Sequence, residues 1–249
     1  MISGQFASRI TLVREKVPSF EEYPFSLPFV RGLETLDLHE KITILVGENG
    51  SGKSTLLEAI AVALGFNPEG GSKNFQFATR PSHSNLSDYL RIAKGYKKPK
   101  DGFFLRAESF FNVATEIERL DEGPGGPPVI GAYGGRSLHE QSHGESFLSL
   151  LMNRFRGDGL YILDEPEAAL SPQRQLAALA RMHQLARAGS QFIVATHSPI
   201  LMACPDALLY ACTSSGPERI KYSDTEHYQV MRDFLVDPSR MLKALLDES

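Results

Sequence analysis

A stretch of nine residues has the residue types and spacing of a loop that holds phosphate: Gly47, Glu48, Asn49, Gly50, Ser51, Gly52, Lys53, Ser54 and Thr55. It fits the pattern G-x-x-x-x-G-K-[ST] at every fixed position. The glycines let the backbone curl so that several N–H groups point at one phosphate. Lys53 can then reach the β- and γ-phosphates, and the Ser54 hydroxyl can ligate Mg²⁺. The loop therefore predicts binding of ATP with Mg²⁺.

Two carboxylates and a histidine follow apolar runs later in the chain. Asp164 and Glu165 end the run that begins at Leu160, and His197 follows the run from Gln191 to Thr196. Ligands of an open parallel sheet lie at the carboxyl ends of its strands, so we expect all three beside the phosphate loop. There, Asp164 would hold Mg²⁺, Glu165 would orient or deprotonate the attacking water, and His197 would contact the γ-phosphate. The alternatives are an acidic turn and a structural histidine.

The elements that must position these groups can be predicted from periodicity and turn residues. Ile44–Val46 has the composition of a buried strand, and the apolar residues from Leu56 to Leu64 recur at helical spacing. Ser171 and Pro172 open a long helix that Gly189 ends. Further strands are expected over 10–13, 33–38, 103–106, 208–212 and 218–222, and further helices over 88–94, 108–120, 228–236 and 241–246.

The order of phosphate loop, Asp164-Glu165 and His197 resembles the ATP-binding cassette (ABC) superfamily of ATPases. That family carries a signature loop before the helix that precedes the acidic strand, and Ser142-His143-Gly144-Glu145-Ser146 stands in that place. The Gly-Glu of this loop, together with Glu167, is typical of the chromosome-maintenance and recombination-repair branch rather than of transporters. More narrowly, the chain resembles a small group of bacterial predicted ATPases.

The resemblance implies an α/β P-loop fold of ABC type: a mostly parallel central sheet flanked by helices, an antiparallel β part and a helical signature region. It implies one domain over 1–249, with a core at 1–65 and 140–212, an insertion at about 66–140 and C-terminal elements at 208–249. It also implies an ATP-dependent homodimer in which Ser142, Gly144 and Glu145 of one copy contact the ATP of the other. The glutamine that helps bind Mg²⁺ in this family is not evident; Glu108 is our replacement for it, with Gln76 as the alternative.

Composition limits the other functions. The chain has 249 residues and a net charge of −4, so it has no global attraction to nucleic acid or to an anionic membrane. Residues 73–100 are locally basic, which indicates a solvated face or, as the minority interpretation, a surface for DNA or a protein partner. Cys204 and Cys212 form no disulfide framework, and neither a membrane span nor a signal peptide is evident. We therefore expect a soluble, cytoplasmic protein.

Three functions remain in competition. The first is a soluble ABC-type ATPase that acts in DNA repair or defence, and the second is the nucleotide-binding subunit of a membrane transporter. A P-loop kinase or a regulatory module is the third, against which the signature loop and His197 argue. Tyr23 and Phe25 precede the phosphate loop and could stack on adenine, although core packing is the favoured role for them.

Overall fold

The computed structural model describes residues 4–73, 84–107, 110–122, 129–137 and 139–246. A six-stranded sheet crosses the molecule, and its first five strands run parallel while the sixth is antiparallel to its neighbour. In spatial order the strands are β5 (Asp101–Arg106), β6 (Gly159–Asp164), β7 (Gln191–Ala195), β3 (Ile42–Val46), β8 (Leu208–Thr213) and β9 (Gly216–Arg219). The predicted mostly parallel α/β fold is confirmed.

Both faces of this sheet are buried, which explains why its strands read as continuous apolar runs. Side chains alternate between two hydrophobic cores, as the period of two of a strand requires. Tyr161 and Leu163 of β6 enter one core, and Leu160 and Ile162 enter the other. The sheet is therefore fixed from both sides, and the carboxyl ends of its strands form a rigid edge.

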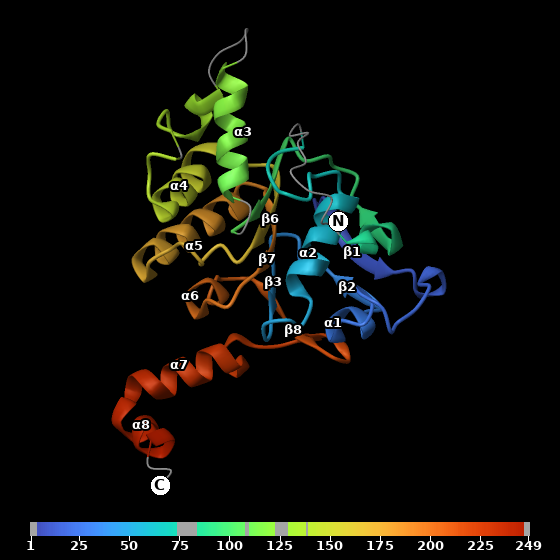
Figure 1. Cartoon of the computed structure of the whole chain (residues 1–249), viewed down its shortest axis with the longest axis vertical. Helices are drawn as coiled ribbons and strands as arrows, with labels where there is room; N and C mark the ends of the chain where they lie inside the picture. Colours follow the sequence, from blue (N-terminus) through green and yellow to red (C-terminus); the bar gives the residue numbers. More distant parts are fainter. Residues whose placement is uncertain (1–3, 74–83, 108–109, 123–128, 138, 247–249) are drawn as a thin grey trace.

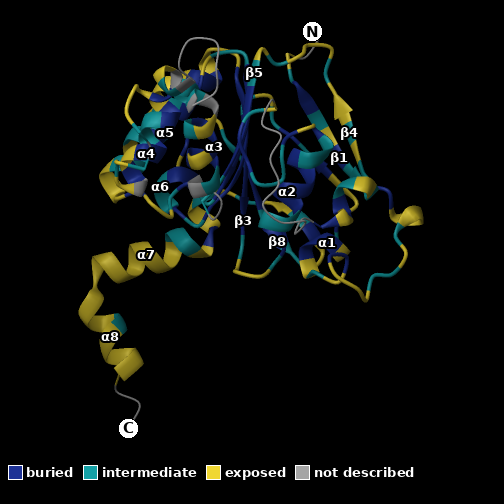
Figure 2. Cartoon of the chain, turned by 45° about the horizontal axis from the view of Figure 1, so that its top comes forward, coloured by how far each residue is buried: buried dark blue, intermediate teal, exposed yellow. Residues whose placement is uncertain are grey.

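Helices α3 (Phe110–Glu122), α4 (His143–Ser149), α5 (Pro172–Arg187) and α6 (Pro199–Met202) cover one face of the sheet, as Figure 2 shows. The opposite face holds α2 (Lys53–Ala63) and a three-stranded antiparallel sheet in the order β2 (Thr35–Asp37), β1 (Ala7–Leu12) and β4 (Leu90–Lys94). The short helix α1 (Pro28–Arg31) lies next to the start of α2 (Figure 1). This arrangement supplies the antiparallel part that the resemblance predicted.

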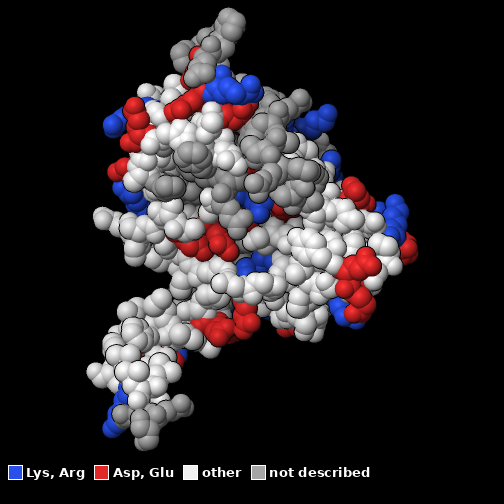
Figure 3. Space-filling model, in the orientation of Figure 1, with Lys and Arg blue, Asp and Glu red and all other residues white. Residues whose placement is uncertain are grey.

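The last two helices, α7 (Glu226–Val236) and α8 (Pro238–Leu246), project from the body as an arm (Figure 1). No residue of either helix is buried, and Leu235, Val236 and Leu246 are more than two-thirds exposed. The surface of the arm carries few charges compared with the centre of the same face (Figure 3). None of the described helices is long and apolar enough to cross a membrane.

The element predictions were mostly confirmed, with one error. The expected helix over 88–94 is wrong, because Leu90–Lys94 is strand β4, paired antiparallel with β1. The antiparallel strand pair after residue 208 and the two final helices are confirmed, although the second strand is Gly216–Arg219 rather than 218–222. Ser171 accepts a hydrogen bond from the Arg174 N–H at the start of α5, as a capping serine does. The division of the chain into core and insertion stays a prediction.

Candidate active site

The glycine loop between β3 and α2 depends on the conformational freedom of its glycines. Gly50 and Gly52 have φ of 77° and 107°, which side-chain-bearing residues rarely adopt. A Cβ at Gly52 would also lie 3.2 Å from the Leu27 Cβ, so the loop passes close to the residue before α1. These glycines bring the backbone into a tight curve at the N-terminus of α2, the geometry that suits an anion.

Lys53, the first residue of α2, is only 4% exposed and is held inside the loop. Its Nζ donates to the carbonyl oxygens of Gly47 at 2.8 Å and Glu48 at 2.7 Å. Burial lowers the pKa of the ammonium, and the nearby carboxylates of Glu165 and Asp164 act in the opposite direction. The cation is thus already positioned at the loop, with partners that a phosphate can replace.

Ser54 and Asp164 meet across the site although 110 residues separate them. The Ser54 hydroxyl donates to Asp164 Oδ1 at 2.9 Å, and Asp164 is 6% exposed at the carboxyl end of β6. Hydroxyl and carboxylate oxygens are the donors that Mg²⁺ prefers, and this ion commonly takes only one or two protein ligands beside phosphate oxygens. The described residues contain no cluster of three or more acidic, histidine or cysteine ligands. The pair therefore fits a metal held jointly with a nucleotide.

Glu165 turns away from the strand that Asp164 ends. Its φ is 49°, in the left-handed region that a non-glycine residue rarely occupies, and its N–H donates to the Ala195 carbonyl at 2.9 Å. This turn leaves the side chain 42% exposed, with Oε1 3.6 Å from His197 Nε2. A strained residue between two strand ends is the kind of feature that occurs at functional sites.

His197 lies beyond β7 and is fixed by two neighbours. Its backbone N–H donates to Glu167 Oε1 at 2.5 Å. Its ring Nδ1 lies 3.0 Å from Nε2 of His227, the second residue of α7. The contact with Nδ1 leaves Nε2 directed toward Glu165. We did not predict His227 from the sequence, because no local pattern distinguishes a histidine at the start of a terminal helix.

Burial lowers the pKa of His197, and the charge of Lys53 lowers it further, against an opposing effect of Glu165. Because the ordinary value for histidine is about 6.5, this imidazole is neutral at neutral pH. A neutral ring has one donor and one acceptor nitrogen, so the contact with His227 decides which nitrogen carries the proton.

Arg106, at the carboxyl end of β5, is a further charged member of this edge that we did not predict. Its guanidinium donates to Glu58 Oε2 on α2 at 2.5 Å, and its Nε lies 3.9 Å from Asp164 Oδ2. The side chains of Arg106 and Glu58 are 19% and 9% exposed. The strand over 103–106 was expected, so the position of its last residue beside Asp164 could have been inferred from the parallel sheet.

The signature residues lie on the face of the sheet opposite α2 (Figure 1). Ser142 caps α4: its hydroxyl accepts from the Glu145 N–H, and the Glu145 carboxylate accepts from the Ser142 N–H at 3.1 Å. Glu145 is also paired with Arg174 of α5 at 3.0 Å. A Cβ on Gly144 would meet the Ala169 carbonyl at 2.4 Å. None of the contacts among the described residues joins this loop to Lys53.

The remaining candidates have different outcomes. Glu108 and Gln76 both lie outside the described residues. Phe25 is 2% exposed and packs edge-on against Phe20 and Tyr89, so its favoured role in the core is confirmed. Tyr23 is 65% exposed, and its stacking on adenine stays a prediction.

Several polar atoms beside the loop lack partners. Ser51 Oγ, Glu167 Oε2 and His197 Nε2 are buried and, within the part of the chain that the structure describes, accept or donate no hydrogen bond. Such atoms are rare in folded proteins and need an explanation. Glu48 and Asn49 line two adjoining hollows of about 510 and 690 Å³. A ligand bound at the loop would supply partners for these atoms and fill part of this space.

Two family models match the chain in succession. One, described as "AAA domain", matches residues 25–124, and the other, described as "AAA domain, putative AbiEii toxin, Type IV TA system", matches residues 130–203. Together they include the glycine loop, the acidic pair and His197. The first model thus includes the glycine loop, and the second includes the acidic pair and His197, which the structure brings to the same edge of the sheet.

Proteins similar to this chain include ABC transporters and an ATP-binding protein. The ABC transporter G family member STR2 of Medicago truncatula is 29% identical over 172 residues, which are 64% of this chain and 24% of that protein. The zinc import ATP-binding protein ZnuC of Vibrio vulnificus is 26% identical over 200 residues, 75% of this chain and 70% of that protein. The chain therefore spans about a quarter of the first relative. In fold, a metal-chelate type ABC transporter in an inward-facing conformation matches 91% of this chain and 88% of its own at a TM-score of 0.50 and 16% identity.

Proposed function

Because the chain belongs to the ABC superfamily of P-loop ATPases, whose members hydrolyse ATP, we propose that its three separated segments bind and hydrolyse one ATP with Mg²⁺. The observation that carries this proposal is the Ser54–Asp164 contact of 2.9 Å, which joins the glycine loop to the acidic strand. The loop N–H groups and Lys53 hold the β- and γ-phosphates, and Lys53 exchanges its contacts with Gly47 and Glu48 for phosphate oxygens.

Ser54 and Asp164 would hold the Mg²⁺, which neutralises charge on the phosphates when it is bound. Glu165 accepts a proton from the attacking water, since its carboxylate is half exposed and faces the site. His197, neutral and fixed by Glu167 and His227, donates from Nε2 toward the γ-phosphate or the water. These four side chains act on one reacting centre.

The signature loop serves a second copy of the chain in this proposal. Ser142 and Gly144 stand at the start of α4, on the opposite face of the sheet from α2, and make none of the described contacts with the glycine loop of their own chain. A head-to-tail homodimer would place them over the partner's γ-phosphate. ATP then closes the pair, and hydrolysis removes the bridging charge and opens it.

The variant Glu165→Gln tests this function. It keeps the shape of the side chain but cannot accept the proton, so we expect ATP to stay bound and the chain to elute as a dimer with Mg-ATP. Light scattering on a sizing column measures the mass, and Glu15→Gln, an exposed acid remote from the site, is the matched control. A Glu165→Gln chain that stays monomeric in saturating Mg-ATP would falsify the head-to-tail homodimer.

The branch of the superfamily gives two candidate roles. The Gly-Glu signature and Glu167 favour a switch in DNA repair or defence in the cytoplasm, and the likeness to ZnuC favours the ATP-hydrolysing subunit of a transporter. Buried free thiols at Cys204 and Cys212 are compatible with a reducing compartment. ATPase rates with and without duplex DNA separate the two roles, because only the first predicts stimulation by DNA.

A further inference from the structure

A second cavity lies at the end of the sheet remote from the glycine loop. It has a volume of about 490 Å³ and is lined by Leu64 after the last turn of α2, by the starts of β5 and β6, and by the loop between β4 and β5. The active site lies at the carboxyl ends of the same strands. The cavity is therefore separate from it.

The lining of this cavity is rich in lysine. Its cationic side chains come from three chain segments and are Lys73, Lys94, Lys97, Lys98, Lys100 and Arg154. Asp101 is its one acidic lining residue among those described, and it is already paired with Arg154 at 2.6 Å. Lys100 is paired with Asp158 at 2.8 Å. The acidic groups nearby are therefore used by two of the six cations.

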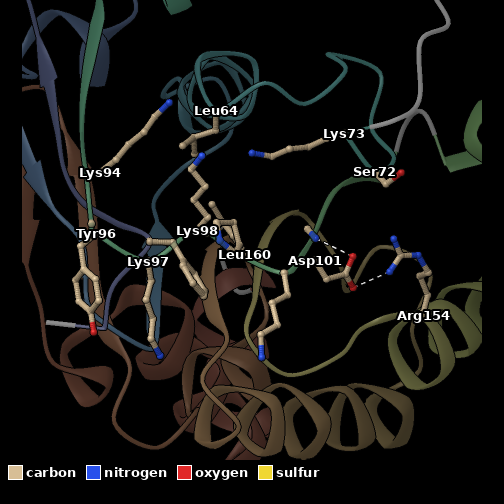
Figure 4. Close-up of a pocket in the computed structure, with 15 residues that line it drawn as sticks. Leu64, Ser72, Lys73, Lys94, Tyr96, Lys97, Lys98, Asp101, Arg154 and Leu160 are labelled. Carbon is tan, nitrogen blue, oxygen red and sulfur yellow. Dashed lines mark hydrogen bonds and ion pairs between the residues drawn. The ribbon is translucent and has the colours of Figure 1, made fainter.

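Lys73, Lys94 and Lys98 form no ion pair with any described residue. Figure 4 shows Lys73 and Lys98 directed toward Leu64, while Lys97 points away from it. Partial burial of its ammonium lowers the pKa of Lys73, and the charge of Lys94 lowers it further, so these two ammonium groups are close enough to repel each other. Cations kept near one another without an anion are unfavourable unless a ligand supplies the negative charge.

The form of the cavity indicates what that ligand is. Phe6, Leu64 and Leu160 add apolar surface to its lining, and the three unpaired lysines line the same hollow of about 490 Å³. A hollow of this volume admits a small molecule, whereas a nucleic-acid strand needs an extended track. Lysine ammonium groups bind phosphate as point charges, and linked phosphates would meet all three together.

We propose that this cavity binds a small anion of two or three linked phosphates through Lys73, Lys94 and Lys98. The site does not depend on the proposed ATPase function, because it shares no residue with the glycine loop, the acidic pair or His197. It gives the chain a second place at which a phosphorylated small molecule can bind.

Inorganic tripolyphosphate is the probe, titrated calorimetrically without Mg²⁺ into the full chain carrying Lys53→Ala, which removes the lysine of the glycine loop. We expect one saturable site per chain. Adding Lys73→Gln and Lys98→Gln should weaken it at least about tenfold, since two of three charge-assisted contacts are lost. Adding Lys16→Gln and Lys221→Gln instead, two exposed lysines elsewhere, should leave it unchanged.

Three results would overturn the proposal: no heat of binding in the Lys53→Ala chain, equal weakening by both pairs of substitutions, or binding of a 12-nucleotide single strand in place of tripolyphosphate. All four lysines are exposed, and an unchanged melting temperature would show that each variant is folded. Failure of the ATPase proposal looks different, because it would appear as Mg-ATP hydrolysis that survives Lys53→Ala, and the lysine cavity holds none of the groups that hydrolyse ATP.

Discussion

The two ends of the central sheet present lysine in opposite ways. At the carboxyl end, Lys53 is buried, bonded to two loop carbonyls and close to the carboxylates of Asp164 and Glu165. At the amino end, Lys73, Lys94 and Lys98 are exposed and have no acidic partner among the described residues. Lysine is therefore held in position by hydrogen bonds at the carboxyl end, whereas at the amino end several lysines only lie close together.

This difference has consequences for binding. A buried cation with fixed partners gives up those partners only to a group of matching shape, so the glycine loop selects its ligand by geometry. Exposed cations attract any compact anion, and salt screens them because the Debye length is only about 10 Å at 0.1 M. We therefore expect binding at the carboxyl end to be selective and little affected by salt, and binding at the amino end to be unselective and weakened by salt.

The largest expected effect comes from Lys53→Ala. It removes the one cation that is buried in the loop, and we expect ATP affinity to fall by at least about 1000-fold, near 4 kcal/mol. Calorimetry with Mg-ATP measures the loss. Lys41→Ala, which removes a partly exposed lysine 3.7 Å from Asp206, should leave ATP affinity within about twofold. Equal affinities for the wild-type and Lys53→Ala chains would remove the distinction between the two ends.

The second largest effect is expected on the stability of the fold, from the ion pair of Arg106 with Glu58 beside Asp164. Arg106→Gln leaves Glu58 buried without its cation, so we expect the free energy of unfolding to fall by about 3 kcal/mol. Urea unfolding measures it. Arg9→Gln breaks an equally short but exposed pair with Asp37 and should lower the free energy of unfolding much less. If both substitutions lower the free energy of unfolding equally, the buried pair of Arg106 and Glu58 does not stabilise the carboxyl end more than an exposed pair does.

A smaller effect is expected from His227→Ala, which removes the partner of His197 Nδ1. We expect turnover to fall about three- to tenfold, because the His197 tautomer is no longer fixed. The charge of His227 helps to lower the pKa of His197, so the variant should have a higher His197 pKa. Because the neutral ring is the active form, activity should then begin to fall at a higher pH as the solution is acidified. The pH–rate profile measures this shift. His183→Ala, a half-buried histidine of α5, should change neither quantity, and an unshifted acid limb in His227→Ala would refute the positioning role.

Sequence patterns predicted the glycine loop and the acidic pair at the carboxyl end, but not every residue that meets them there and not the cavity at the amino end. The spacing from Gly47 to Ser54 and the acids after Leu163 follow from local chemistry, which is why their meeting could be predicted. The segment Leu90–Lys94 was mistaken for a helix because its strand state depends on pairing with β1, about 80 residues earlier. His227 likewise reaches the site only through the position of α7. The unpaired lysines were recognised as a basic stretch, but the cavity that gathers them depends on the starts of β5 and β6.

The central claim is that side chains from separate segments act on one triphosphate, and a double-mutant cycle on ATP hydrolysis tests it most directly. Single-turnover rates are compared for Glu165→Gln, His197→Ala and the chain with both changes. Because residues that act as a unit are not additive, the double variant should be no more than about threefold slower than the slower single variant. Losses that multiply would mean that Glu165 and His197 act independently, and the convergence of these segments on one reacting phosphate would be contradicted.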